Sequence, residues 1–198
     1  MKKVFRINTI FFAAIILFLA AGCKKEEPAK LPALKSENSS DSLYYKNKAV
    51  KDSSSIENPA AIDADGNLYK SVTIGRQIWL VENLKTTTYL NGDPILSNLR
   101  GSEWTNTSSG AYQISSNIYG NLYNAYAVED GRQICPAGWH VPSASEWDTL
   151  LIYLGGEGNA GGRMKESGTS HWLDPNAGAT NESGFSALPA GLITEGGG

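Results

Sequence analysis

Few residues of this chain could carry covalent or metal chemistry: among 198 residues there are two cysteines and two histidines. Cys23 is separated by one glycine from the apolar run Ile10–Ala21, while Cys135 lies far along the chain. A thiol just outside an apolar segment can be alkylated by a diacylglycerol group, and the acyl chains then hold a protein on a membrane. The position of Cys23 therefore predicts a lipid anchor.

The segment in front of Cys23 has the features of an export signal. Met1–Arg6 is basic without an acid, and the apolar run after it is shorter than the roughly 20 residues that a membrane-spanning helix needs. The small residues Ala20–Gly22 resemble the lipobox of lipoprotein signal peptides, although the leucine usual at its first position stands one place early, at Leu19. We predict a signal peptide over residues 1–22; the alternative is an ordinary signal peptide with an incidental cysteine.

The stretch after Cys23 is rich in Lys, Glu and Ser and has few large apolar side chains. Such a composition buries too little surface to offset the entropy of ordering, so we predict that residues 23–59 are the lipidated cysteine and a disordered tether. Lys24–Glu27 resembles the surface-export signal of lipoproteins in the Bacteroidetes; solvated tether charge is the alternative. We expect a lipid-anchored protein of the bacterial outer membrane, exposed at the cell surface.

Residues 60–198 hold all five tryptophans and are long enough for one folded domain. The two-residue connection Gly75-Arg76 predicts a hairpin of strands over 68–74 and 77–80. In the turn cluster Asp63–Asn67, the side chains of Asp63, Asp65 and Asn67 stand at alternate positions, as the ligands of a calcium loop do. Because Ile74 stands where the closing glutamate would be, a plain turn is favoured.

The clearest predicted element is a helix over Ser143–Leu154. Ser143 and Glu146 have the spacing of a capping box, and apolar residues from Trp147 onward follow the i, i+3, i+4, i+7 pattern of one buried face. Glu146 therefore has a structural role, and we do not assign it as a catalytic acid. Residues 119–128 predict a second, short helix, whereas the glycine-rich residues 155–162 predict loops.

Aromatic side chains are the candidate ligand-binding residues. Tyr119, Tyr123 and Tyr126 form a cluster that could stack on a sugar, and Trp104 and Tyr112 are the large anchors of the loop-rich segment before it. Ordinary packing in a core is the alternative, and for the tyrosine cluster it is the favoured one.

From about Asp63 onward the chain resembles the Fibrobacter succinogenes major paralogous domain, a family of bacterial extracytoplasmic proteins. The resemblance rests on stretches that follow one another across the globular part. They are Asp65-Gly66-Asn67-Leu68-Tyr69, Ile74-Gly75-Arg76-Gln77-Ile78-Trp79, Glu82-Asn83-Leu84-Lys85-Thr86-Thr87, Tyr119-Gly120-Asn121-Leu122-Tyr123-Asn124, Cys135-Pro136-Ala137-Gly138-Trp139-His140-Val141-Pro142-Ser143, Glu146-Trp147, Thr180-Asn181-Glu182-Ser183-Gly184-Phe185 and Ala187-Leu188-Pro189-Ala190-Gly191.

The resemblance implies two structural expectations. The family's usual final third, with a closing cysteine expected to pair with Cys135, has no counterpart here, so we expect residues 60–198 to be an incomplete domain with Cys135 unpaired. Trp139–Trp147 is also similar to the helix entry of formylglycine-generating enzymes, which share a C-type-lectin-like architecture. We expect an α+β, C-type-lectin-like, loop-rich fold with short antiparallel strands.

Several observations argue against catalysis. The oxidase chemistry of formylglycine-generating enzymes needs two cysteine thiolates for copper, and with Cys23 lipidated only Cys135 remains. His140 and His171 have no companion at metal-ligand spacing, so we predict neither a metal nor a cofactor. A formal net charge of -3 without a basic stripe predicts that nucleic acid is not a partner.

The sequence thus favours a non-catalytic, membrane-anchored lipoprotein whose extracytoplasmic domain binds a glycan or a protein. The alternative is a structural cell-envelope protein without a small ligand, and an oxidase relative is less favoured because the second sulfur is lacking. Whether the aromatic residues line an exposed concave patch or are buried discriminates between these hypotheses.

Overall fold

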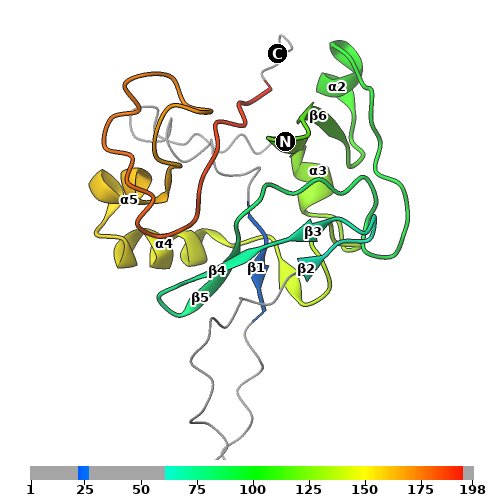
Figure 1. Ribbon diagram of the computed structural model, residues 1–198. Coiled ribbons are helices and arrows are strands. Elements are labelled where there is room, and N and C mark those ends of the chain that lie inside the picture. Colours follow the sequence, from blue (N-terminus) through cyan, green and yellow to red (C-terminus); the bar gives the residue numbers. More distant parts are fainter. Residues whose placement is uncertain (1–21, 27–60, 194–198) are drawn as a thin grey trace, which may run out of the picture.

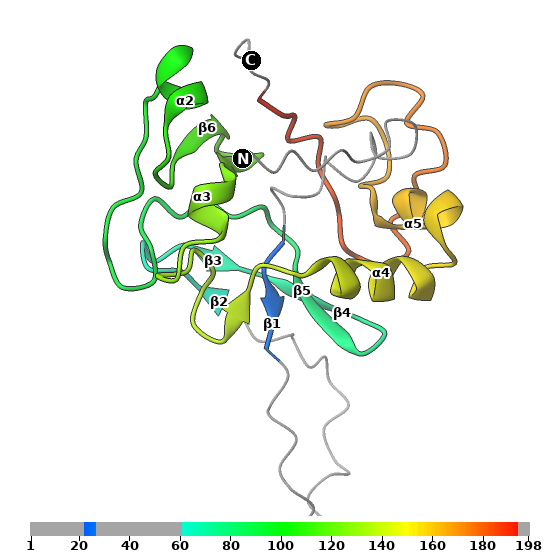
Figure 2. The same cartoon turned by 180° about the vertical axis from the view of Figure 1, so that it is seen from behind.

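The computed structural model describes residues 22–26 and 61–193. The predicted signal peptide and nearly all of the predicted tether lie outside these ranges. The described residues form short antiparallel strands, short helices and long loops, which confirms the α+β class. Figures 1 and 2 show helices α4 and α5 on one side of the central strands, and β6, α2 and α3 on the other.

The main sheet has four strands in the order β4-β5-β1-β8. β4 (Ser71–Ile74) and β5 (Gln77–Leu80) form the predicted hairpin, in which Gly75 takes a φ of 62° that favours glycine. The strand predicted over 68–74 is divided, because β3 (Leu68–Tyr69) pairs with β2 (Ala61–Ile62) in a separate ribbon.

The middle of the main sheet is occupied by β1 (Lys24–Lys25), antiparallel to both β5 and β8 (Trp139–His140). The blue arrow in Figure 1 marks this strand. The prediction that a tether begins directly after Cys23 is therefore wrong for residues 24–26. Hydrogen bonds on both sides hold the segment, since Leu80 N–H donates to the Cys23 carbonyl at 3.1 Å and Glu26 N–H donates to the Gly138 carbonyl at 2.9 Å.

Helix α4 (Ala144–Tyr153) confirms the predicted helix, with Ser143 as its N-cap and Leu154 as its C-cap. The Glu146 carboxylate accepts the Ser143 N–H at 2.8 Å, as a capping box requires.

The region predicted as glycine-rich loops instead contains helix α5 (Glu157–Met164). Close packing explains the glycine at position 162, because a Cβ there would stand 2.2 Å from the Gly178 carbonyl oxygen.

The core has two parts, one on each side of the main sheet. Under α4 and α5, Trp79 is fully buried, its ring centroid 4.7 Å from Trp147 and 6.1 Å from Phe185. The other part contains the buried Tyr69 and Tyr89 together with residues of the β6–β7 hairpin. Because Trp147 is half-buried and Leu150 and Leu154 are buried, the predicted apolar face of α4 is confirmed.

A second hairpin joins β6 (Tyr112–Ser116) to β7 (Gly120–Tyr123), with an irregular register near its turn. The short helix α2 (Ser102–Asn106) precedes it and the single-turn helix α3 (Ala125–Val128) follows. The helix predicted over residues 119–128 is therefore wrong in its first half, where the backbone pairs with β6 instead.

Candidate binding site

A hollow of about 300 Å³ lies beside the β6–β7 hairpin. Its lining residues are mostly polar, and they are Asp65, Asn67, Lys85, Thr87, Ile114, Ser116, Asn117 and Asn121. Five of these eight belong to three of the stretches that carry the family resemblance, at residues 65–69, 82–87 and 119–124. Segments far apart in the sequence thus converge on one place.

The first wall of this hollow is the turn at residues 63–67, which is fixed by the buried Asp63. Its carboxylate accepts the backbone N–H groups of Asp65 and Asn67 at 3.0 and 2.9 Å, the Asn67 side-chain amide at 2.9 Å and the Tyr69 hydroxyl at 2.6 Å. Burial and the hydrogen bond to Asp63 raise the pKa of Tyr69, so it remains protonated. Because protein donors occupy the oxygens of Asp63, the favoured plain turn fits the structure better than a calcium loop.

Asp65 joins this turn to the segment that contains Lys85 and Thr87, which is the second wall of the hollow. Its carboxylate accepts the backbone N–H and the hydroxyl of Thr87, and also the hydroxyl of Thr88. Partial burial acts to raise the pKa of Asp65, but the hydrogen bonds from Thr88 and Thr87 outweigh it and the pKa lies below its ordinary value. Asp65 is therefore an ionised structural group whose lone pairs are largely occupied.

Lys85 projects into the hollow from a fixed backbone. Its N–H donates to the Tyr69 hydroxyl at 2.9 Å, and its carbonyl accepts the side-chain amide of Asn121 at 2.9 Å. No carboxylate within residues 22–26 and 61–193 forms an ion pair with the Lys85 ammonium. Across the hollow, Asn117 is exposed in the β6–β7 turn. Within the part of the chain that the structure describes, the hollow is therefore lined by an ammonium without an ion pair and by the exposed amide of Asn117.

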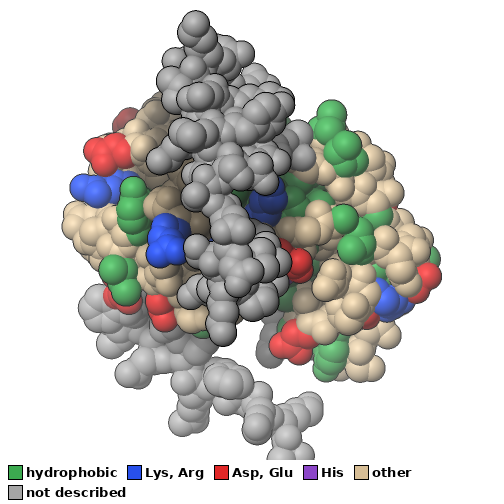
Figure 3. Space-filling view, turned by 90° about the horizontal axis from the view of Figure 1, so that it is seen from below, with side chains coloured by type: hydrophobic (Ala, Val, Ile, Leu, Met, Phe, Trp, Pro, Cys, Tyr) green, Lys and Arg blue, Asp and Glu red, His purple; other side chains and the backbone are tan. Residues whose placement is uncertain are grey.

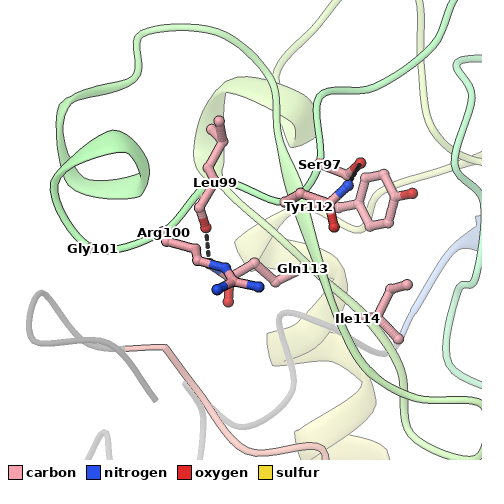
Figure 4. Close-up of a pocket in the computed structure, with 8 residues that line it drawn as sticks. Ser97, Leu99, Arg100, Gly101, Tyr112, Gln113 and Ile114 are labelled. Atoms are coloured by element: carbon pink, nitrogen blue, oxygen red, sulfur yellow. Dashed lines mark hydrogen bonds between the residues drawn. The ribbon is translucent and has the colours of Figure 1, made fainter.

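A second hollow, of about 340 Å³, lies farther along β6 (Figure 4). Its lining residues are Ser97, Asn98, Leu99, Arg100, Gly101, Tyr112, Gln113 and Ile114. Gln113 is held there by donating from its amide to the Leu99 carbonyl at 3.0 Å. Ile114 lines both hollows and is 66% exposed, so the two hollows adjoin at this residue and together follow β6.

Comparison with known protein families assigns this domain to a family. Residues 72–197 match the family model of the Fibrobacter succinogenes major domain. The chain belongs to this family. No curated protein and no solved structure gives a significant match. Within residues 22–26 and 61–193, none of the helices has the length and apolar character needed to cross a membrane.

The aromatic residues predicted as a binding platform are dispersed over the family domain. Tyr112 lines the second hollow but is only 7% exposed, and it packs against Tyr123 with ring centroids 6.1 Å apart. Tyr119 meets the His171 ring edge-on at 6.0 Å, Tyr126 is 52% exposed, and Trp104 is half-buried on α2. The structure therefore builds no common platform from them.

The polar lining of the first hollow escaped the sequence reasoning, which looked for aromatic side chains. The signal that could have found it was present in the three family stretches themselves. Each of them contributes Asp, Asn, Lys or Thr side chains to the hollow: Asp65 and Asn67, Lys85 and Thr87, and Asn121.

The two histidines each pair with one carboxylate. His140 Nε2 lies 2.9 Å from Glu146, and His171 Nδ1 lies 2.8 Å from Glu166. Among the described residues, no three His, Cys, Asp or Glu side chains are grouped as a metal site would need.

Glu146 has the structural role that was predicted for it. Partial burial acts to raise its pKa, but hydrogen bonds from the Ser143 backbone, Lys24 and His140 lower it to about 2. The Lys24 ammonium, almost fully buried, contacts this carboxylate at 3.0 Å. Glu146 therefore joins the helix start to β1 and β8.

The structure pairs Cys23 with Cys135 in a disulfide, with the Cα atoms 5.8 Å apart. The expectations that Cys135 is unpaired, or that its partner lies in a further segment, are not met here. The physical reason is the insertion of β1 beside β8, which brings Cys23 next to the residues that precede β8. Because one sulfur cannot form both a disulfide and a thioether, a chain lipidated at Cys23 lacks this bond.

Proposed function

We propose that this chain is a lipoprotein whose Fibrobacter succinogenes major domain is a non-catalytic binding module for a glycan. The observation that carries the proposal is the convergence of three segments distant in sequence on the polar hollow beside β6, two of them within the region that matches the family. Sugars present many hydroxyl groups, which both donate and accept hydrogen bonds. Amide, hydroxyl and ammonium groups on a fixed backbone suit such a ligand, because little ordering entropy is lost on binding.

The state of the ionisable side chains supports binding rather than catalysis. Asp65 is the carboxylate among the residues that line the two hollows, and three donors from Thr87 and Thr88 already occupy it. Its lowered pKa makes it a poor proton acceptor at neutral pH.

The anchor is the second part of the proposal and rests on the sequence. Cys23 follows Ala20–Gly22 and an apolar run of signal-peptide length, so we place a diacylglyceryl thioether at Cys23. The membrane is then the partner of the N-terminus, and residues 27–60 separate it from the domain. The outer membrane, exposure at the cell surface and a C-type-lectin-like architecture belong to the same proposal.

A structural envelope protein is the second candidate, and one surface favours it. Ile62 and Leu68 face each other across the β2–β3 ribbon, 58% and 68% exposed, as an apolar contact for another protein would be. On the face shown in Figure 3, basic and acidic side chains are interspersed.

A titration with a panel of oligosaccharides, followed by NMR of the purified full-length protein, tests glycan binding. We expect the amide resonances of Lys85, Asn117 and Asn121 to shift together. Asn117→Ala should weaken binding, whereas Asn106→Ala, which removes an exposed amide from α2, should not. If every oligosaccharide leaves these resonances unchanged, glycan binding is refuted and the structural role is favoured.

A further inference from the structure

We infer that the two hollows along β6 accept an acidic glycan, a chain of uronic acid residues, with its carboxylates at Lys85 and Arg100. This inference rests on the proposed glycan binding and specifies the class of sugar.

The charges that line the two hollows support an anionic ligand. Lys85 lines the first hollow and Arg100 the second. Within the described ranges no carboxylate forms an ion pair with either side chain. Asp65 is the carboxylate among the residues that line the two hollows. It accepts hydrogen bonds from Thr87 and Thr88, which stabilise its negative charge. Among the described residues, Lys85 and Arg100 are thus cations without an ion pair, and the Glu103 carboxylate beside the second hollow accepts the Arg100 backbone N–H at 3.1 Å.

The position of the two cations supports a chain rather than a single sugar. They lie in separate hollows that adjoin at Ile114. The segment from Tyr112 to Asn117, which is β6 and the first residue of the turn after it, contributes residues to the lining of both hollows. An extended segment of this length spans about 16 Å. The exposed Ile114 between the hollows offers an apolar contact to the C–H face of a sugar ring, and Figure 4 shows it beside Tyr112 and Gln113 on the same strand.

The uncharged part of the lining favours a sugar over an acidic peptide. Asn67, Thr87, Ser116, Asn117 and Asn121 make the rest of the lining amide and hydroxyl in character. The Asn67 amide, the Thr87 hydroxyl and the Asn121 amide donate within the protein, and Asn117 is exposed in the β6–β7 turn. These groups match the hydroxyls that uronic acids carry beside each carboxylate, whereas a polyglutamate chain offers carboxylates and backbone amides only.

Isothermal titration of the full-length protein tests the inference with three probes. They are an oligogalacturonate tetramer, the same tetramer with its carboxyl groups reduced to alcohols, and a polyglutamate of equal charge. We expect the acidic sugar to bind about tenfold more tightly than the reduced one at low salt, because each exposed charge pair contributes a factor of roughly 1.5 to 5. Added salt should reduce this difference.

Two variants and a matched control locate the binding. Lys85→Ala and Arg100→Ala should each weaken binding of the acidic tetramer by a factor of roughly 1.5 to 5, and should weaken binding of the reduced tetramer by a smaller factor. Arg76→Ala, which removes an exposed charge from the β4–β5 turn, should change neither. Equal binding of the acidic and reduced sugars would overturn the inference and leave glycan binding intact. Equal binding of polyglutamate would overturn it in favour of charge alone, and binding of none of the probes would count against both proposals.

Discussion

Reduction of the Cys23–Cys135 disulfide should markedly destabilise the unlipidated protein. The bond joins residues separated by 112 positions. In the chain-entropy model, closing a loop of that length reduces the entropy of the unfolded chain by the equivalent of about 4.8 kcal/mol at room temperature. For a domain of this size, the loss should lower the melting temperature by roughly 15–20 °C.

Circular dichroism melts with and without a phosphine reductant measure this effect. The matched control is the double variant Cys23→Ser/Cys135→Ser, whose melting temperature should be low and insensitive to the reductant. A wild-type melting temperature that does not respond to reduction would refute the reasoning, because the disulfide would then be absent or would contribute nothing to stability.

Four further outcomes follow from the contacts described above. Trp147→Ala should reduce the free energy of unfolding by about 2–4 kcal/mol, measured by urea denaturation, because the indole is half-buried against Trp79. Glu146 has a folded pKa of about 2 against an ordinary 4.5, so its stabilisation is present above pH 4.5 and lost as the pH falls toward 2; Glu146→Gln should flatten that part of a stability–pH profile. Gly110→Ala should strongly lower the yield of folded protein, since a Cβ there would stand 1.9 Å from the Tyr89 hydroxyl. Cys23→Ser should abolish incorporation of labelled palmitate, and a labelled variant would disprove the anchor.

Local signals in the sequence were sufficient for elements that short-range chemistry determines. The capping box at Ser143 and Glu146 predicted the start of α4, and Gly75 predicted the hairpin turn between β4 and β5. Both depend on residues within a few positions of each other. For the same reason the turn at Asp63 was predicted, since its carboxylate bonds to groups at most six residues away.

Elements that depend on distant partners were missed or misread. Helix α5 looked like a loop because glycine has a low helix propensity, yet Gly162 is there to let Gly178 approach. Residues 119–128 have a helical spacing of apolar residues, but pairing with β6 decides the conformation of Gly120–Tyr123. The polar hollow requires Asp65, Lys85 and Asn121 to meet in space, which no window of neighbouring residues can reveal.

The place of β1 in the sheet has a consequence for the anchored protein. Cys23 is 1% exposed and belongs to the core, so acyl chains attached to its sulfur cannot occupy that position. Lipidation must therefore withdraw residues 22–26 and leave the facing backbones of β5 and β8 without the strand between them. The anchored molecule would then present a vacancy with a free Cys135 thiol at its rim and Glu146 without its lysine partner. If Cys23 carries the proposed lipid, attachment to the membrane and completion of the sheet by β1 would be alternative states of one polypeptide.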